Sequence, residues 1–594
     1  MRLLGGRGLT GLARAPLPTR HTTLSLLEAR RHNSSSSSAA TTRPPFFTAP
    51  ADEAPRPWYI TTPIFYVNAS PHIGHLHSVV LADTFARFAR LREPGREVMF
   101  LTGTDEHGLK IQQAAAKAGR SEQEFCDEVS LRFRDLADRA NISYTTFFRT
   151  TEERHYTAVQ AFWDKLVARG DVYKGSHSGW YSVSDECFYS DIQVEKVDGV
   201  MVSSETGSEV VWQEEENWKF RLGAYGDKLT EWLSRPESVY PEAYRQDLLK
   251  QAASLNDLSV SRPSSRVSWG VPVPGDPTQT IYVWVDALIN YLTNTGYPAP
   301  TVGWPPNMHV VGKDIIKFHA MHWPALLMAA GEAPPRRVLA HAHWTMHRTK
   351  MSKSRGNVAD PLAAMDQYGV DGVRWYLMRA GGSLPTDADY SPVELAANYD
   401  RLRDQVGNLA QRIASPAILD RVCDWQSKFS VPELDASLSA LRGSYDAHFE
   451  AYDISRAASL LMDTVVDANK FFTDEAPWAS SDATAAVVYV YAALRLVGIL
   501  AQPIMPAKAV ELLDRLGVPE SERAWANATW QPGAPVDAEE IVRRIKNGAM
   551  PFRGTTLFPR AELEEDSLPT NETKGKKTGK KEKKPKEKKV KENK

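Results

Sequence analysis

The chain has 594 residues, of which 42% are hydrophobic and 24% charged, a globular composition long enough for several domains. It has only three cysteines, none of them in a CxxC pair, which argues against a disulfide framework and against a four-cysteine zinc site. The net charge of −2 combines basic ends with an acidic body: residues 1–50 carry +6, residues 574–594 carry +9, and the stretch between them carries −17. This distribution excludes a uniformly basic nucleic-acid binder.

The two ends are predicted to lie outside the folded body. Residues 1–50 hold seven arginines, one glutamate and a run of serines, which is typical of a mitochondrial transit peptide and linker; an unrelated disordered tail is the alternative. Residues 561–594 are predicted to be a disordered Lys-rich tail, either merely solvated or an electrostatic arm for a polyanion. We find no uninterrupted apolar run of about 18 residues, so we expect no membrane-spanning helix.

The first elements of the body alternate between strand and helix. Residues 58–68 and 97–108 are rich in β-branched and aromatic residues and predict strands; a helical pattern follows each, the second over residues 109–140. This order predicts an α/β fold with a Rossmann-like parallel sheet, and residues 51–170 would be the first half of that catalytic domain. Ligands bind at the carboxyl ends of such strands, where polar clusters occur at His72 and Asp105.

The pattern changes after residue 170. Residues 171–265 are rich in Gly, Ser, Glu and Trp with short strand-like pieces, which predicts an inserted connective domain. Sheet-like signals return in TIYVWVDALINYL and NMHVVGKDIIKFHAMHWPALLMAAG, so residues 266–393 are predicted to be the second half of the catalytic domain. Residues 394–560 have the periodicity of a separate helical bundle.

Two histidines three residues apart, His72 and His75, follow the first predicted strand in NASPHIGHLHS. A metal site would need further ligands, and a buried structural pair is the ordinary alternative. Gly74 between them allows close approach of a ligand to the backbone, and imidazole N–H groups at the start of a helix suit phosphate oxygens. From these residues alone the metal, packing and phosphate interpretations all stay open.

A second polar segment, TKMSKSRGN at residues 349–357, would by itself be an ordinary solvated basic loop. HIGH after the first strand and KMSKS far downstream are together the paired signatures of class I aminoacyl-tRNA synthetases. The chain resembles the methionyl-tRNA synthetase family over roughly residues 57–530. The segments that carry the resemblance are TTPIFYVN, LTGTDEHG, WGVPVPGD, YVWVDALINYL, VGKDIIKFH, KMSKSRGN and DEAPW.

The resemblance implies ATP-dependent joining of L-methionine to tRNA(Met) through methionyl-adenylate, with ATP and Mg²⁺ as cofactors. Such chemistry depends on positioning and on stabilising negative charge, for which hydrogen-bond donors and cations are suited. It implies that His72, Gly74, His75, Lys350 and Lys353 are catalytic, and that residues 266–393 include the KMSKS loop and a region contacting the tRNA stem. The implied ATP-binding residues are Tyr66, His72, His75, Gly312, Lys313, Asp314, Lys350 and Lys353.

The spacing of Trp284, Ala287 and Tyr291 would place them on one face of a helix. Without the resemblance, the preferred interpretation would be an aromatic stripe packed in the hydrophobic core. Sulfur–aromatic contacts favour such a pocket for a thioether. Asp105 matches the family's carboxylate for the α-ammonium group, a charge-assisted pairing. The implied methionine-binding residues are Ile64, Asp105, Trp284, Ala287, Tyr291 and His319.

The helical region, residues 394–560, would by resemblance bind the anticodon. Asn408 and Arg412 share a helix face at i and i+4, and Trp478 lies in EAPW. Their residue types suit flipped bases, which are recognised by stacking and by hydrogen bonds to base edges. For Trp478 the alternative is helix packing.

The sequence departs from the family in its insertion, where Ser182 and Asp185 stand in place of a CxxC pair and Cys187 is alone. We therefore predict no zinc and no other bound metal site. The strand motif has Phe65–Tyr66 where the family often has two tyrosines.

The sequence thus predicts a mitochondrial-matrix methionine–tRNA ligase that is monomeric and has no membrane partner. One alternative is another class I synthetase for an aliphatic amino acid, although those carry larger editing insertions. The other is an inactive synthetase-like RNA-binding scaffold, against which the intact His72, His75 and both lysines argue.

Overall fold

The computed structural model describes residues 56–561 except 185, 347–348, 351–358 and 424–429. These residues all belong to the unit Ala49–Lys594, and the other unit of the chain, Met1–Thr48, is outside them. The predicted transit peptide, the Lys-rich tail, Asp185 and Lys353 therefore lie outside the described residues.

A parallel sheet forms the centre of the catalytic region, as the strand–helix alternation predicted. The strands run in the order β10–β16–β15–β1–β3–β2, and β4 also pairs with β3. Each of these pairings is parallel. The strand bounds are β1 (Trp58–Thr61), β2 (Phe65–Tyr66), β3 (Val98–Asp105), β4 (Thr146–Arg149), β10 (Val239–Tyr240), β15 (Met308–Gly312) and β16 (Val338–His341).

The first predicted strand, residues 58–68, is two short strands rather than one. Thr61 pairs with Leu101 and Phe65 with Thr104. From the first pair to the second, the β1–β2 segment advances by four positions and β3 by three. Pro63 lies in the break and has no N–H to give to the sheet. Such an extra residue redirects side chains next to a site, and Ile64 in the break faces a cavity.

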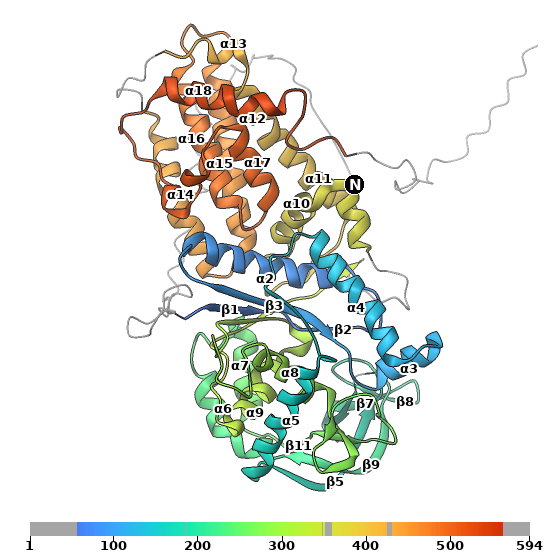
Figure 1. Cartoon of the computed structure of the whole chain (residues 1–594). Helices are drawn as coiled ribbons and strands as arrows, with labels where there is room; N and C mark the ends of the chain where they lie inside the picture. Colours follow the sequence, from blue (N-terminus) through green and yellow to red (C-terminus); the bar gives the residue numbers. More distant parts are fainter. Residues whose placement is uncertain (1–55, 185, 347–348, 351–358, 424–429, 562–594) are drawn as a thin grey trace, which may run out of the picture. The chain divides into compact units, whose positions relative to one another are not determined.

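Helices cover both faces of the sheet, which explains why β1 is buried along its whole length. The helix α2 (Ile73–Arg92) packs along β1, β3 and β15 on one face (Figure 1). On the other face, Tyr59 and Leu101 belong to a buried cluster that includes residues of α5 (Glu153–Ala168), α8 (Val283–Thr293) and α9 (Trp323–Ala330).

Two segments differ locally from the sequence prediction. The helix expected over 109–140 is divided into α3 (Leu109–Ala118) and α4 (Glu122–Arg139), because Gly119 adopts φ +66° and Ser121 starts a new helix with a capping box to Glu124. The segment TIYVWVDALINYL is sheet-like only at its start, since β14 (Asp276–Ile281) ends just before α8.

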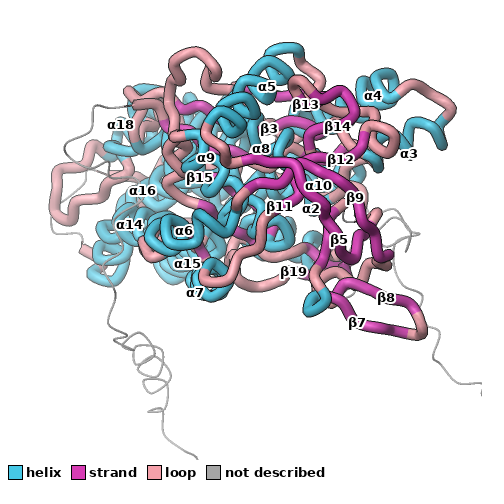
Figure 2. Tube along the Cα trace, turned by 90° about the horizontal axis from the view of Figure 1, so that it is seen from below, coloured by secondary structure: helices cyan, strands magenta, loops and turns pink. Residues whose placement is uncertain are grey.

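Residues 171–265 combine antiparallel strands with the helices α6 and α7, and β5 and β9 lie side by side with the β7–β8 hairpin apart from them (Figure 2). β10 is an exception, because it pairs with β16 in the parallel sheet. The insertion is therefore not one uninterrupted segment. Its elements and their neighbours are β5 (Val172–Ser182), β6 (Cys187–Tyr189), β7 (Val194–Val197), β8 (Val200–Ser203), β9 (Val211–Phe220), α6 (Gly226–Leu233), α7 (Glu242–Ala252), β11 (Leu258–Ser259), β12 (Ser261–Pro263) and β13 (Pro272–Val273).

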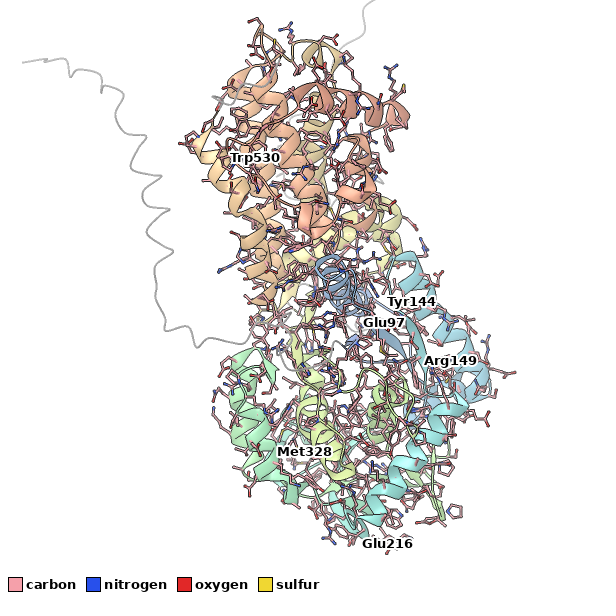
Figure 3. The ribbon with its side chains drawn as sticks, turned by 60° about the vertical axis from the view of Figure 1, so that its left-hand side comes forward. Glu97, Tyr144, Arg149, Glu216, Met328 and Trp530 are labelled. Carbon is pink, nitrogen blue, oxygen red and sulfur yellow. The ribbon has the colours of Figure 1, made fainter. Side chains whose placement is uncertain are left out.

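The remainder is helical, apart from a small sheet of β17 (Trp344–Met346), β18 (Thr349–Lys350) and β19 (Ala388–Asp389). The predicted bundle is confirmed, and Trp530 packs among its helices with the indole N–H donating to Asp435 at 2.8 Å (Figure 3). The helices are α10 (Pro361–Gly381), α11 (Pro392–Arg401), α12 (Asn408–Ile413), α13 (Pro416–Leu419), α14 (Pro432–Glu450), α15 (Ile454–Glu475), α16 (Thr484–Ala501), α17 (Pro506–Arg515) and α18 (Ala538–Ala549).

Within the described residues, α16 is the one helix long and apolar enough to cross a membrane. Its residues are 89% buried within the protein, and Arg495 interrupts its apolar sequence. That burial is the property of a core helix of the bundle.

A buried ion pair connects α2 to the helical part of the chain. The Arg374 guanidinium on α10 lies 2.6 Å from the Asp83 carboxylate on α2, and both side chains are almost fully buried. Arg374 also donates to the carbonyl oxygens of Ile504 and Pro503, between α16 and α17, at 3.0 and 3.1 Å. One side chain therefore connects α2 to the turn between α16 and α17.

Candidate active site

A cavity of about 410 Å³ lies at the carboxyl ends of the central strands. This is where parallel sheets bind ligands. Of the residues predicted for ATP or methionine, the described lining includes Ile64, Tyr66, His72, Gly74, His75, Asp105, Trp284, Ala287, Tyr291, Gly312, Asp314 and His319. The structure thus brings together side chains that are up to 255 residues apart in the sequence.

His72 and His75 form the N-terminal cap of α2. Nδ1 of His72 accepts from the backbone N–H of Gly74 and Nδ1 of His75 from the backbone N–H of His72, both at 3.1 Å. The rings lie 3.8 Å apart, centroid to centroid. Because both Nδ1 atoms accept, a neutral ring carries its proton on Nε2, which makes each Nε2 a donor at a helix N-terminus.

A local contact explains why a glycine occupies position 74. A Cβ atom at this position would lie 2.9 Å from Cε1 of His72, so any side chain would displace that ring. The glycine therefore keeps His72 in its capping position, a constraint in addition to the expected room for a nucleotide.

The aromatic part of the cavity is built on α8 and on the π-helical turn Phe318–His322. The rings of Trp284 and Phe318 stack at 3.8 Å, and the Tyr291 hydroxyl lies 2.8 Å from Nε2 of His319. Nδ1 of His319 donates to the carbonyl of Ile315 at 3.0 Å, so Nε2 accepts from Tyr291. Burial lowers the pKa of His319 to about 4, and this wall is uncharged at neutral pH.

Asp105 has an unpaired carboxylate oxygen in the part of the site that the structure describes. It lines the cavity, it is 9% exposed, and its Oδ1 atom has no hydrogen-bond partner among the described residues. Burial raises the pKa of Asp105 well above its ordinary value, and the nearby carboxylates of Asp286 and Glu186 raise it further. A ligand cation would supply the missing partner.

A buried network holds the segment that carries Asp105. His107 Nδ1 lies 2.6 Å from one oxygen of Asp286 on α8, and His155 Nε2 on α5 lies 2.9 Å from the other. Burial alone would raise the pKa of Asp286, but the two histidines lower it below its ordinary value. Glu106 is paired with Arg149 on β4, labelled in Figure 3, at 2.7 Å. Glu106 and His107 hold this segment in place, and they are not among the residues that line the cavity.

The predicted GKD segment is divided by the structure. Gly312 and Asp314 line the cavity, and a Cβ atom at Gly312 would lie 2.6 Å from Oδ1 of Asp314. Lys313 is not part of the described lining, since its ammonium group pairs with Asp387 at 2.7 Å. The assignment of Lys313 to ATP stays a prediction, and in this structure its ammonium group is paired with Asp387 instead of lining the cavity.

The KMSKS segment begins at β18. Lys350 is the last residue of that strand, and its backbone pairs with that of Thr345. Lys353 lies outside the described residues.

Sequence reasoning missed several polar lining residues, and Glu186, Ser78 and His341 are three of them. Glu186 comes from the turn between β5 and β6, and its side chain reaches Tyr66. Ser78 on α2 and His341 at the end of β16 are 2.8 Å apart. A search for polar residues at the end of every predicted strand would have found His341, whereas Glu186 has no local signal.

The predicted anticodon residues lie together on the bundle surface. Asn408 and Arg412 are on α12, and the Arg412 guanidinium lies 5.5 Å from the ring centroid of Trp478, which is 47% exposed. An exposed indole beside a guanidinium is a stacking platform for a base.

No group of three or more His, Cys, Asp or Glu residues able to hold a metal ion occurs in residues 56–561, leaving aside the gaps named above. Cys187 is not in a disulfide, and the Ser182 hydroxyl is hydrogen-bonded to that of Ser184 where a CxxC pair would begin. The expectation of no zinc stays a prediction.

A parallel sheet with this cavity, a histidine-capped α2 and a KMSKS sequence after β18 define the class of protein as a class I aminoacyl-tRNA synthetase. The family model described as tRNA synthetases class I (M) matches residues 58–209 and 200–414. The model described as anticodon binding domain of methionyl tRNA ligase matches residues 427–553.

Similar proteins agree with these matches. The mitochondrial methionine–tRNA ligase of Bos taurus is 44% identical over 84% of this chain and 89% of its own length, and that of Homo sapiens is 42% identical over 85% and 89%. A crystal structure of Mycobacterium tuberculosis methionyl-tRNA synthetase bound by methionyl-adenylate is 38% identical, with a TM-score of 0.76 over 85% of this chain and 100% of that one. The chain belongs to the methionyl-tRNA synthetase family, and its enzyme class is methionine–tRNA ligase.

Proposed function

We propose that this chain joins L-methionine to tRNA(Met) through methionyl-adenylate, and that it does so in the mitochondrial matrix. The observation that carries the proposal is the composition of one cavity, in which two imidazole donors, an uncompensated buried carboxylate and an uncharged aromatic wall meet. These groups suit the phosphates, the α-ammonium group and the thioether of the two substrates. The mitochondrial names of the relatives support the compartment.

In the first step, the carboxylate of methionine attacks the α-phosphorus of ATP and pyrophosphate leaves. His72 and His75 would donate from Nε2 to phosphate oxygens, where the N-terminus of α2 also favours negative charge. Lys350 and Lys353 would neutralise the pyrophosphate. Asp105 would hold the ammonium group, and Trp284, Ala287, Tyr291 and His319 the side chain, with Ile64 beside them.

Mg²⁺ would enter with ATP and neutralise phosphate charge when bound. The part of the chain that the structure describes offers it no group of three protein ligands, so we expect the phosphates to hold it. In the second step a ribose hydroxyl at the 3′ end of the tRNA attacks the methionyl carbonyl and AMP leaves. Gly312 and Asp314 would face the nucleoside, and Tyr66 would close the ATP side of the cavity.

Methionine-dependent ATP–pyrophosphate exchange tests this function. We expect exchange with methionine and none with leucine, isoleucine or valine. Exchange with leucine alone would contradict the substrate assignment, and no exchange with any amino acid would contradict the enzyme. Sedimentation of the purified protein tests the proposed monomer, which should give a mass near 66.2 kDa before any processing.

Trp478→Ala is expected to lower kcat/KM for tRNA by about 10- to 100-fold, because stacking of a base on an aromatic ring contributes about 1–3 kcal/mol. Methionine-dependent exchange should stay unchanged, since Trp478 is outside the cavity lining. Trp478→Phe is the matched control and should retain most of the activity. A loss of exchange equal to the loss of charging would show that Trp478 serves packing instead.

A further inference from the structure

Glu186 is a buried acid that the insertion contributes to the catalytic cavity. It lies in the turn between β5 and β6, it is 5% exposed, and its backbone has φ +53°. A non-glycine residue with such a backbone is uncommon and is costly unless its surroundings hold it. The contacts of its carboxylate show what holds it.

The two oxygens of Glu186 have different partners on the catalytic domain. Oε2 accepts from the Tyr66 hydroxyl at 2.9 Å, and Oε1 accepts from the backbone N–H of Lys110 at 3.1 Å. Lys110 is in the first turn of α3, whose own N-cap, Gly108, has no side chain to offer. Glu186 therefore caps α3 from the insertion, where a negative charge is favoured by the helix dipole.

Gly108 is required for this arrangement. It has φ +104°, and a Cβ atom there would lie 2.7 Å from the Tyr66 hydroxyl and 3.2 Å from Oε1 of Glu186. The backbone between Asp105 and α3 thus passes directly against the Tyr66–Glu186 pair. A change in that pair would move the segment that begins with Asp105.

We propose that Glu186 is a positioning residue through which the insertion sets the binding of the substrate α-ammonium group. It acts by fixing the start of α3, which follows Asp105 in the chain, and by adding a second negative charge near Asp105. The unpartnered Oδ1 of Asp105, in the same cavity lining, is the atom that this arrangement presents to a cation. The inference rests on the proposed function, because the cation is the ammonium group of methionine.

The electrostatics give a distinctive expectation for pH. After burial and Asp286, Glu186 is the next cause that raises the pKa of Asp105. Removing its charge should let Asp105 ionise at lower pH while weakening the attraction for the ammonium group. The other titratable groups near Asp105 include Glu106 and His107 on its own segment, Tyr66 on β2, Lys110 on α3, Cys126 on α4, and Asp286 and Tyr291 on α8.

The test is methionine-dependent ATP–pyrophosphate exchange with the full-length Glu186→Gln variant between pH 5 and 9. We expect KM for methionine to rise about tenfold at pH 7.5 and KM for ATP to stay within about twofold. The acid limb of kcat/KM for methionine should move about one pH unit lower, the size expected for loss of one nearby like charge. Glu186→Asp should recover part of the wild-type KM.

Glu209→Gln, at an exposed position on the same insertion, is the matched control and should match wild type. Equal increases in KM for methionine and KM for ATP would overturn the inference. So would a lower plateau of kcat/KM for methionine whose acid limb stays at the wild-type pH. Either result would leave Glu186 a purely structural cap. Unchanged kinetics in Glu186→Gln would also overturn it. Absence of exchange in the wild-type protein would instead contradict the proposed function, so the two failures are distinguishable.

Discussion

Asp105→Asn is expected to lower kcat/KM for methionine in ATP–pyrophosphate exchange by about 10²- to 10³-fold. Removing one partner of a buried charge pair costs about 2–5 kcal/mol, and each 1.36 kcal/mol is a factor of ten. Among the described residues, the Oδ1 atom of Asp105 has no hydrogen-bond partner that could replace the ammonium group. The loss should therefore fall on methionine and leave KM for ATP nearly unchanged.

The same substitution should not destabilise the folded protein. Since the pKa of Asp105 is raised in the fold, the folded state binds this proton more tightly than the unfolded chain does. Ionising the group therefore costs folding free energy as pH rises from the unfolded pKa of about 4 to the raised folded value. Asparagine removes that cost, and thermal unfolding at pH 7.5 should give a Tm equal to or above that of wild type.

Asp135→Asn is the control for Asp105→Asn, because Asp135 is exposed on α4. It should change neither kinetics nor Tm. A lower Tm for Asp105→Asn, with KM for ATP and methionine rising together, would show that Asp105 is a structural residue. Full activity would contradict its assignment to the ammonium group.

Of the substitutions considered, Arg374→Met is expected to lower the free energy of unfolding most, by about 3–5 kcal/mol, because it leaves the buried Asp83 carboxylate without its main partner. Asp83 is fully buried; burial alone would raise its pKa, but Arg374 and Arg87 lower it below the ordinary value. The change also removes the donors to the carbonyls of Pro503 and Ile504. Urea unfolding followed by tryptophan fluorescence should show a lower midpoint.

Arg401→Met is the control for this effect, since the Arg401 side chain is 51% exposed and lies 3.9 Å from Asp463. A surface pair of this kind contributes about 0–1 kcal/mol. Adding Asp83→Leu to Arg374→Met should recover part of the loss, because a buried pair replaced on both sides leaves no uncompensated charge. If Arg374→Met unfolds like wild type, the pair does not hold α2 to the bundle.

Much of the site was predictable because its residues occur in local patterns. His72, Gly74 and His75 form a helix cap from adjacent residues, and Trp284, Ala287 and Tyr291 share a face because α8 is helical. Asp105 could be placed because it ends a strand, and the carboxyl ends of parallel strands face the ligand. In these cases local geometry and the resemblance agree.

Other features could not be found in this way, since the deciding contact is distant in sequence. Lys313 adjoins two lining residues, yet Asp387, 74 residues away, holds its ammonium group outside the lining. The break at Pro63 that turns Ile64 toward the cavity depends on the register with β3. A hydrophobic run such as TIYVWVDALINYL fits a buried strand and a buried helix equally, so only packing decided where α8 begins.

By itself, the sequence determined the family, the alternation that builds a parallel sheet, the separate helical bundle and the residue types of the two signatures. These follow from local spacing and from motifs that keep their order along the chain. The tertiary structure alone decided that Oδ1 of Asp105 is buried without a hydrogen-bond partner among the described residues, that Glu186 enters the cavity from 120 residues away, and that Arg374 joins α2 to the turn after α16. Burial and electrostatic coupling depend on which segments meet in space, and the spacing of residues along the chain does not specify which distant segments come into contact.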